Sequence, residues 1–254
     1  MILINDDNWQ EVVQESQNQG FSVGALPRQT GIGEMSCAMV FAEQVPIIPE
    51  SEWKTRIAEM TANGLFIGQR WKSDTKLDYQ NGLGFCWAKS LAQICMAVRA
   101  AQNQPFVQLM GESLAECVGY RNKGYYLDRA LEYANNRGIA SIATVPHLKI
   151  TKGEWSSQYA EERQSYMPLE WWDLGGKEVW AETITALLMG YGCYVGYDWW
   201  GHAVFLDMLR INAKGQIEVH TPNTHGQGND AWLAGSKAIP SMGSFVLRGM
   251  NLAA

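Results

Sequence analysis

Apolar residues follow two different periods along the chain, and the change from one to the other divides it. Between residues 86 and 98 they recur at helical spacing over a long, mostly uncharged run. Helices are also expected at 127–136 and 177–188, each closed by a following glycine. Short apolar runs separated by turns then predict strands at 193–197, 202–209, 217–220 and 243–247. Helices first and strands second favour an α+β fold with a seam between two halves.

The first fifty residues carry a weaker pattern. Glycines break them into short apolar stretches, which predict strands and loops, with one strand at 38–42. A helix is expected from Glu52 to Met60, with Ser51 as its N-terminal cap. We therefore expect a strand-rich N-terminal extension over residues 1–70 and a main domain over residues 71–254.

Composition excludes several classes of function. The formal net charge is −6 and no run of lysine and arginine occurs, so nucleic acid is not expected as a partner. The N-terminus lacks the basic and apolar segments of a secretory signal, and no apolar stretch is long enough to cross a membrane. The five cysteines are widely spaced without a Cys-x-x-Cys pair, which argues against a disulfide framework or a zinc site and favours a reducing compartment. No metal and no cofactor are expected.

A cysteine at the start of the long predicted helix is a candidate nucleophile. Two glycines lie just before Cys86, so the helix is expected to begin at or next to this residue. The positive N-terminal end of a helix favours the thiolate, which is the reactive form. Most cysteines among apolar residues are simply part of a core, and this interpretation is sufficient for Cys95, Cys117 and Cys193.

The residues around Cys86 resemble the active-site segment of papain-like cysteine peptidases. The segment reads QNGLGFCWAKS over residues 80–90. In that family a glutamine six residues before the nucleophile supplies an oxyanion-hole donor, and a tryptophan follows the cysteine directly. Gln80 and Trp87 stand at these two positions. The resemblance implies that the Gln80 amide and the backbone N–H of Cys86 bind the oxyanion of a tetrahedral intermediate.

The resemblance continues downstream in the order of the family. Residues 122–125 look like the stretch that pairs with the substrate backbone, and Gly124 keeps one of its two glycines. Residues 201–204 resemble the histidine segment, which implies His202 as the base that accepts the thiol proton. Residues 223–226 resemble the asparagine segment, so Asn223 would orient the imidazole. Trp200 is a candidate wall of the substrate pocket, with plain buried packing as the alternative.

Three other histidines compete with His202. His147 lies in a loop without a matching context, and His220 falls on a predicted strand. His225 shares a loop with Asn223 and would be the base if the alignment were displaced. It also stands where the family carries a tryptophan that shields the asparagine–histidine hydrogen bond from water. A more wetted bond would orient the imidazole of His202 less firmly.

The resemblance spans residues 78 to about 250 and implies the papain-like fold, with a helical half that begins its long helix at the nucleophile and an antiparallel β half. It implies a thiol endopeptidase that cuts peptides or proteins through a thioester. Two alternatives stay open: a papain fold with a weak or inactive site kept as a structural module, and a thiol hydrolase of cell-wall peptides or amides. Gln80 argues against the second alternative.

The surroundings of the proposed enzyme follow from the same resemblance. The string of residues 199–202, together with the N-terminal extension, resembles peptidases encoded among phage structural genes. This implies a virion or the host cytoplasm as the location, and virion or identical subunits as partners besides the substrate. Residues 1–70 are either a propeptide that covers the groove or a permanent docking extension, and we favour the latter.

Overall fold

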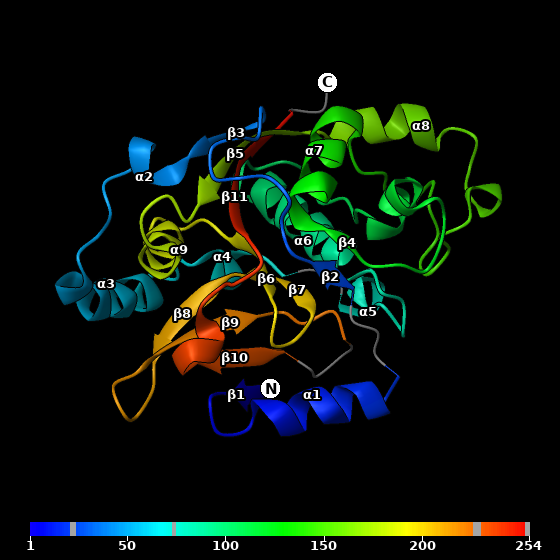
Figure 1. The fold of residues 1–254 in the computed structure, drawn as a ribbon. Coiled ribbons are helices and arrows are strands. Elements are labelled where there is room, and N and C mark those ends of the chain that lie inside the picture. Colours follow the sequence, from blue (N-terminus) through cyan, green and yellow to red (C-terminus); the bar gives the residue numbers. More distant parts are fainter. Residues whose placement is uncertain (21–23, 73–74, 226–229, 252–254) are drawn as a thin grey trace.

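The computed structural model describes residues 1–20, 24–72, 75–225 and 230–251 (Figure 1). The α-helices are α1 Trp9–Asn18, α2 Phe41–Gln44, α3 Glu50–Ala62, α4 Ile67–Arg70, α5 Thr75–Asp78, α6 Cys86–Ala101, α7 Leu127–Arg137, α8 Tyr159–Glu162 and α9 Val179–Leu188. Short 3-10 helices occur at Gly111–Val118, Lys152–Glu154, Arg163–Tyr166 and Gly235–Ala238. Over these described ranges, every helix is too short or too polar to pass through a bilayer.

The strands are β1 Ile2–Ile4, β2 Ala25–Leu26, β3 Ala38–Val40, β4 Tyr125–Tyr126, β5 Pro168–Leu174, β6 Cys193–Tyr197, β7 His202–Leu206, β8 Met208–Ile211, β9 Ile217–Thr221, β10 Ala231–Ala234 and β11 Ser244–Met250. A five-stranded sheet has the order β3-β5-β11-β6-β7, and a four-stranded sheet has the order β1-β10-β9-β8. A third sheet pairs β2 with β4. Helices α6, α7 and α8 lie together on one side of Figure 1, and β8, β9 and β10 lie below them.

The α+β arrangement expected from the sequence is confirmed. The predicted long helix begins at Cys86, and the two other main-domain helices are found as α7 and α9. The four predicted C-terminal strands are present, with 202–209 divided into β7 and β8. The first twenty residues differ from the expectation, because they contain helix α1. Trp9, Val12 and Val13 do recur at helical spacing in α1, but they are its only apolar residues, and a stripe this short does not distinguish a helix from a strand.

Each of the first three strands pairs with a distant part of the chain. β1 runs parallel to β10, β2 runs parallel to β4, and β3 runs parallel to β5. The remaining neighbours in the two larger sheets are antiparallel. The N-terminal residues therefore complete sheet edges whose other strands come much later in the sequence.

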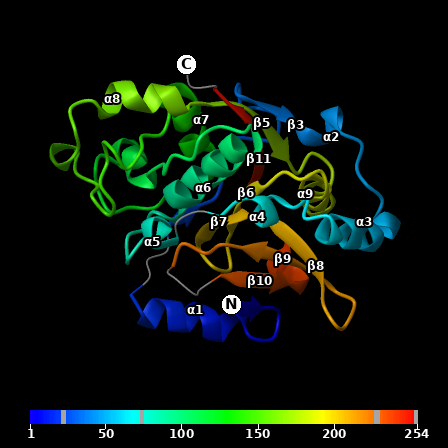
Figure 2. The same ribbon diagram turned by 180° about the vertical axis from the view of Figure 1, so that it is seen from behind.

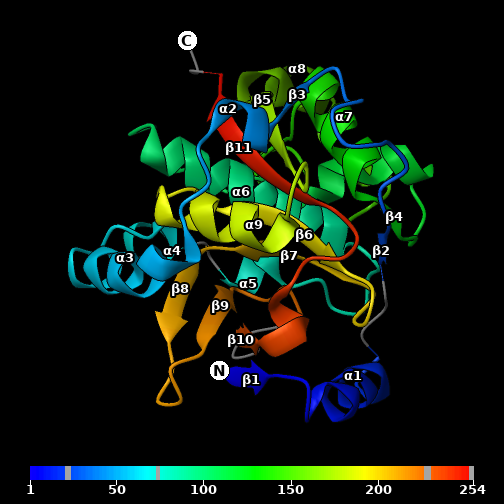
Figure 3. The ribbon, with the colours of Figure 1, turned by 60° about the vertical axis from the view of Figure 1, so that its left-hand side comes forward.

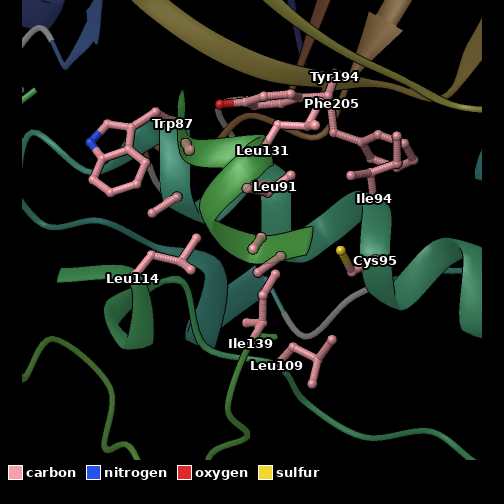
Figure 4. Packing of buried hydrophobic residues seen from close by; sticks show 14 of the residues in the cluster. Trp87, Leu91, Ile94, Cys95, Leu109, Leu114, Leu131, Ile139, Tyr194 and Phe205 are labelled. Carbon is pink, nitrogen blue, oxygen red and sulfur yellow. The ribbon is translucent and has the colours of Figure 1, made fainter. Parts of the chain in front are cut away.

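The five-stranded sheet separates two hydrophobic clusters. Because side chains alternate along a strand, Tyr194 and Phe205 face the cluster around α6, and their neighbours Val195 and Val204 face the cluster under α9. Figure 4 shows the first two side chains with Leu91 and Ile94 of α6. Figure 3 shows α9 crossing in front of β6. Packing against the sheet buries α6 almost throughout, which fixes its N-terminus next to β7.

Candidate active site

The Cys86 thiol lies at the N-terminus of α6, against the start of β7. The backbone N–H of Ala203 donates to Sγ of Cys86 at 3.4 Å. The Ser90 hydroxyl, one turn further along α6, donates to the Ala203 carbonyl at 2.9 Å. These two contacts join the helix to the strand, and since Ala203 follows His202, they bring the first residue of β7 next to the thiol. The first turn of α6 adds the positive end of the helix dipole.

The imidazole of His202 is oriented by Asn223. His202 Nε2 and Asn223 Oδ1 are 2.9 Å apart, and the backbone N–H of His225 donates to the same oxygen at 3.2 Å. The backbone donor of His225 identifies this side-chain atom as the amide oxygen, and since that oxygen can only accept, Nε2 carries a proton. Nδ1 is then the basic nitrogen, and it is buried without a hydrogen-bond partner in the described parts of the chain. A free basic nitrogen suits the acceptance of a proton.

Two aromatic rings enclose the hydrogen bond between His202 and Asn223. The Trp200 ring lies 4.7 Å from the His202 ring and the His225 ring lies 4.0 Å from it. His202, Trp200 and His225 are 1%, 4% and 5% exposed, whereas Asn223 is partly exposed, so the bond is sheltered from water at its imidazole end. Burial lowers the pKa of His202 to about 4, opposed by the hydrogen bond to Asn223. Burial, and then the charge of His202, lowers the pKa of His225 to about 2.

The side chain of Gln80 is held in one orientation. Its oxygen accepts from the Thr224 hydroxyl at 2.6 Å, and its NH2 group donates to the Leu83 carbonyl at 2.8 Å. The backbone N–H of Gln80 donates to the Thr224 carbonyl at 3.0 Å. Because an amide NH2 carries two hydrogens, one remains for a ligand. Thr224 was not identified from the sequence, although it directly follows the predicted Asn223.

Trp87 connects the segment before Cys86 to residues 122–125. Its side chain is fully buried, and its N–H donates to the Gly84 carbonyl at 3.1 Å and the Lys123 carbonyl at 3.3 Å. The Asn122 oxygen accepts from the Gly84 N–H at 2.7 Å. These bonds hold the residues before Cys86 against the segment that contains Gly124. Asn122 belongs to the motif quoted above, but its contact is with the protein backbone and could not be deduced from the motif.

Residues 24–28, hereafter the strap, cross the site between its two sides. The Gly24 carbonyl accepts from the Tyr125 N–H at 2.9 Å, and the N–H groups of Gly24 and Ala25 both donate to the Gly201 carbonyl at 3.1 Å. The Gly24 N–H also lies close enough to the Cys86 thiol to lower its pKa. A Cβ on Gly24 would lie 2.4 Å from the Gly84 carbonyl oxygen, and a Cβ on Gly124 would lie 2.6 Å from the Gly24 oxygen. The strap therefore lies directly over the thiol, in a place that only glycines allow.

Burial by these neighbours changes the protonation of the candidate pair. It raises the pKa of Cys86 to about 11, although backbone N–H groups of Ala203, Trp87 and Gly24 partly oppose the rise. The pKa of His202 is lowered to about 4 for the same reason. Near pH 7 the site thus holds a neutral thiol and a neutral imidazole. In this covered arrangement the sulfur is therefore in its less nucleophilic form, because the thiolate is the reactive one.

The reactivity of Cys86 is expected to rise steeply with pH. With a thiol pKa of about 11, the thiolate fraction at pH 7 is on the order of 10⁻⁴, so alkylation should accelerate about tenfold for each pH unit between 7 and 10. The measurement is the rate of iodoacetamide modification at Cys86, followed by peptide mapping with mass spectrometry. A short peptide with an ordinary cysteine serves as the reference. An inflection below pH 8 at Cys86 would contradict the covered state.

Among the residues that the structure describes, no group of three or more histidine, cysteine, aspartate or glutamate side chains is placed to hold a metal ion. The chemistry available at the site is that of a thiol, an imidazole and amide donors. These groups suit nucleophilic acyl transfer.

Comparison with known proteins identifies the fold. No protein-family profile matches the chain, and no curated protein matches it in sequence. Among solved structures, xylellain, a cysteine protease from Xylella fastidiosa, is similar over 92% of this chain and 97% of its own, at 12% identity and a TM-score of 0.61. Procathepsin L2 from the larval midgut of Tenebrio molitor is similar over 99% and 84%, at 14% identity and a TM-score of 0.61. A recombinant stem bromelain precursor is similar over 99% and 95%, at 14% identity and a TM-score of 0.57. The chain therefore has the fold of the papain-like cysteine proteases.

Proposed function

We propose that this protein is a papain-like cysteine peptidase that hydrolyses peptide bonds of peptide or protein substrates through a thioester acyl-enzyme. Cys86 is the nucleophile, His202 the base and later the acid, and Asn223 the residue that orients the ring. The observation that carries the proposal is the hydrogen bond from His202 to Asn223, which leaves the basic Nδ1 free beside the strand residue that contacts the thiol. The shared fold supports it.

The reaction follows from the positions of these groups. Nδ1 of His202 takes the thiol proton, and the Cys86 sulfur attacks the carbonyl carbon of the peptide bond. The backbone N–H of Cys86 and the remaining amide N–H of Gln80 bind the oxyanion. The imidazolium gives its proton to the leaving amine, and a thioester remains. Water, deprotonated by His202, then hydrolyses the thioester and restores the thiol.

The proposed substrate binds where the strap now lies. The Tyr125 N–H and the Gly201 carbonyl each bond the strap backbone, so they offer a donor and an acceptor to an extended peptide. Gly124 leaves room for that backbone, because a side chain there would collide with it. Trp200 is 4% exposed and packs against the Trp199 and His225 rings, and the cavities that it borders are also lined by the strap and α1, so its contact with substrate would require the strap to move.

A papain fold without turnover is the second candidate, and one observation favours it. The thiol is fully buried with a raised pKa, which is the environment of an unreactive cysteine. A role in cell-wall hydrolysis has no such observation in its favour. The virion or host-cytoplasm setting, and association with virion or identical subunits, stay predictions from the sequence.

A digest of a mixed peptide library separates the two candidates. The protein used is Gly24→Ala, in which the added methyl group forces the strap away from the Gly84 carbonyl. We expect new peptide termini, and we expect prior treatment with an epoxide warhead to abolish them while modifying Cys86. If Cys86 is alkylated rapidly but no peptide is cut, the catalytic proposal is wrong and the inactive papain fold is the better description.

A further inference from the structure

The strap is anchored on its C-terminal side by two buried carboxylates. The Arg28 guanidinium binds both oxygens of Asp173, at 2.6 and 2.9 Å, and the Asp173 side chain is fully buried. One oxygen of Asp128 accepts from the N–H of Gln29 at 2.9 Å and from the N–H and hydroxyl of Thr30 at 2.8 and 2.9 Å. Asp128 belongs to α7 and Asp173 to β5, so the strap is attached to both the helical part and the five-stranded sheet.

The chain beyond these anchors is part of the body. β3 forms the edge of the five-stranded sheet by pairing with β5. Phe41 of α2, and Trp53 and Ile57 of α3, are buried in the cluster under α9. Residues 38–62 therefore contribute to the core on which the site rests. Because this segment is part of the core, proteolysis could not remove it together with the N-terminal residues without disrupting the fold.

The chain before the strap is also docked. β1 pairs with β10 and Ile4 is buried in the second cluster. The Trp9 ring lies 6.1 Å from the Trp199 ring, and Lys237 Nζ lies 4.3 Å from the centre of the Trp9 ring. Figure 2 shows α1 beneath β10 at the lower edge of the molecule, next to the N-terminus. Contacts on both sides thus hold the strap in place.

The backbone of Gly24 covers the thiol. Its N–H lies close to the Cys86 sulfur, whereas its carbonyl accepts from the Tyr125 N–H. The strap therefore shields the sulfur with main-chain atoms, and a peptide that reaches the sulfur has to displace them.

A cavity beside the strap provides space for movement. It has a volume of about 530 Å³ and is lined on one side by Ala25, Leu26 and Pro27. The opposite side is formed by Trp199 and Met242 among others. Residues 25–27 could move into this space while Arg28 keeps its contacts with Asp173.

We propose that the strap is a tethered inhibitory element, which closes the groove of this protein and stays attached to the body when the groove opens. The inference rests on the proposed peptidase function only in calling the strap inhibitory. Whether the strap covers the Cys86 thiol can be measured without any peptide hydrolysis. Opening then consists of a local displacement of residues 24–27 by a competing peptide or partner. Proteolytic removal of the N-terminal part is not required.

Alkylation of Cys86 tests the closure without any peptide hydrolysis. Gly24→Ala places a methyl group against a backbone oxygen that cannot move aside, so the iodoacetamide rate at Cys86 should rise at least tenfold at pH 7.5. Gly153→Ala is the matched control, because a Cβ there meets nothing within 4 Å. Thr30→Val loses one hydrogen bond to Asp128 and should increase the alkylation rate by a smaller factor. It replaces Gly24→Ala as the test variant if Gly24→Ala proves to have a much lower melting temperature. Equal rates in all four proteins, wild type included, would overturn the proposal.

A cut in the chain tests the tether. A recognition sequence for a specific protease is inserted between Gly33 and Glu34, which are both exposed. After cutting, we expect the N-terminal fragment to co-elute with the body in gel filtration and Cys86 to remain slow to alkylate. If the fragment is released and Cys86 of the cut protein is then alkylated as fast as in Gly24→Ala, residues 1–33 are a removable propeptide and the tether is contradicted. If Gly24→Ala is alkylated rapidly at Cys86 but cuts no peptide, the proposed peptidase function is wrong, and the proposal that the strap covers the thiol still holds.

Discussion

Replacing His202 by alanine in the Gly24→Ala background is expected to slow peptide hydrolysis by about 10⁴-fold or more. The variant loses both the acceptor of the thiol proton and the donor to the leaving amine. Binding of the peptide should change little, so the loss is expected in kcat rather than in KM. The measurement is steady-state hydrolysis of a peptide identified in the library digest.

Two further variants make this result specific. Cys86→Ala combined with His202→Ala should be no slower than either single change, because the two residues act as a unit. His147→Ala is the control, since this histidine lies away from the site and contacts Lys89 and Glu112. If His225→Ala abolished hydrolysis while His202→Ala did not, then His225 would be the base, as a displaced alignment of the motif would require.

Replacing Arg28 by alanine is expected to lower the free energy of unfolding by about 3–5 kcal/mol. The change leaves the Asp173 carboxylate buried without its bidentate partner, and a lone charge in such a place is strongly destabilising. It also removes the stacking of the guanidinium on Phe245, whose ring centre lies 5.2 Å away. Urea unfolding of the wild type and the variant at neutral pH gives the difference.

Arg248→Ala provides the matched control for this effect. Its guanidinium also binds a carboxylate, that of Glu170, but these side chains are 35% and 43% exposed. An exposed pair of this kind contributes about 0–1 kcal/mol. Similar small losses for both arginines would show that the contact between Arg28 and Asp173 does not hold the strap. Asp173→Asn in the Arg28→Ala background should recover part of the loss by removing the unpaired charge.

The position of the thiol could be predicted because its signals are local. The helix that begins at Cys86 has a long apolar run with glycines before it, and these features need no knowledge of the rest of the chain. The neighbours of His202 and Asn223 could be matched to known segments in the same way. The structure then places the His202 ring within hydrogen-bonding distance of Asn223, and the residue after it against Cys86.

The strap could not be predicted because it acts through its backbone. The N–H and carbonyl groups of Gly24 make its contacts, and every residue except proline carries both of these groups. From the sequence pattern, Gly24 is explained only as one of the glycines that separate short N-terminal strands. The actual reason for a glycine there is the Gly84 carbonyl oxygen, which comes sixty residues later. Helix α1 is hard to predict for a different reason, because its apolar stripe consists of only Trp9, Val12 and Val13, and so short a pattern is shared by helices and strands.

The pairing of β1 with β10 has a consequence for the order in which the molecule is completed. During synthesis residues 2–4 leave the ribosome long before residues 231–234, so β1 has no partner until β10 has emerged. Such distant contacts form late in folding, because closing a long loop precedes the gain from the contact. The strap lies between this edge and β3. In a nascent chain the cysteine is therefore uncovered until Tyr125, Asp173 and Gly201, which bind the strap, have emerged and folded.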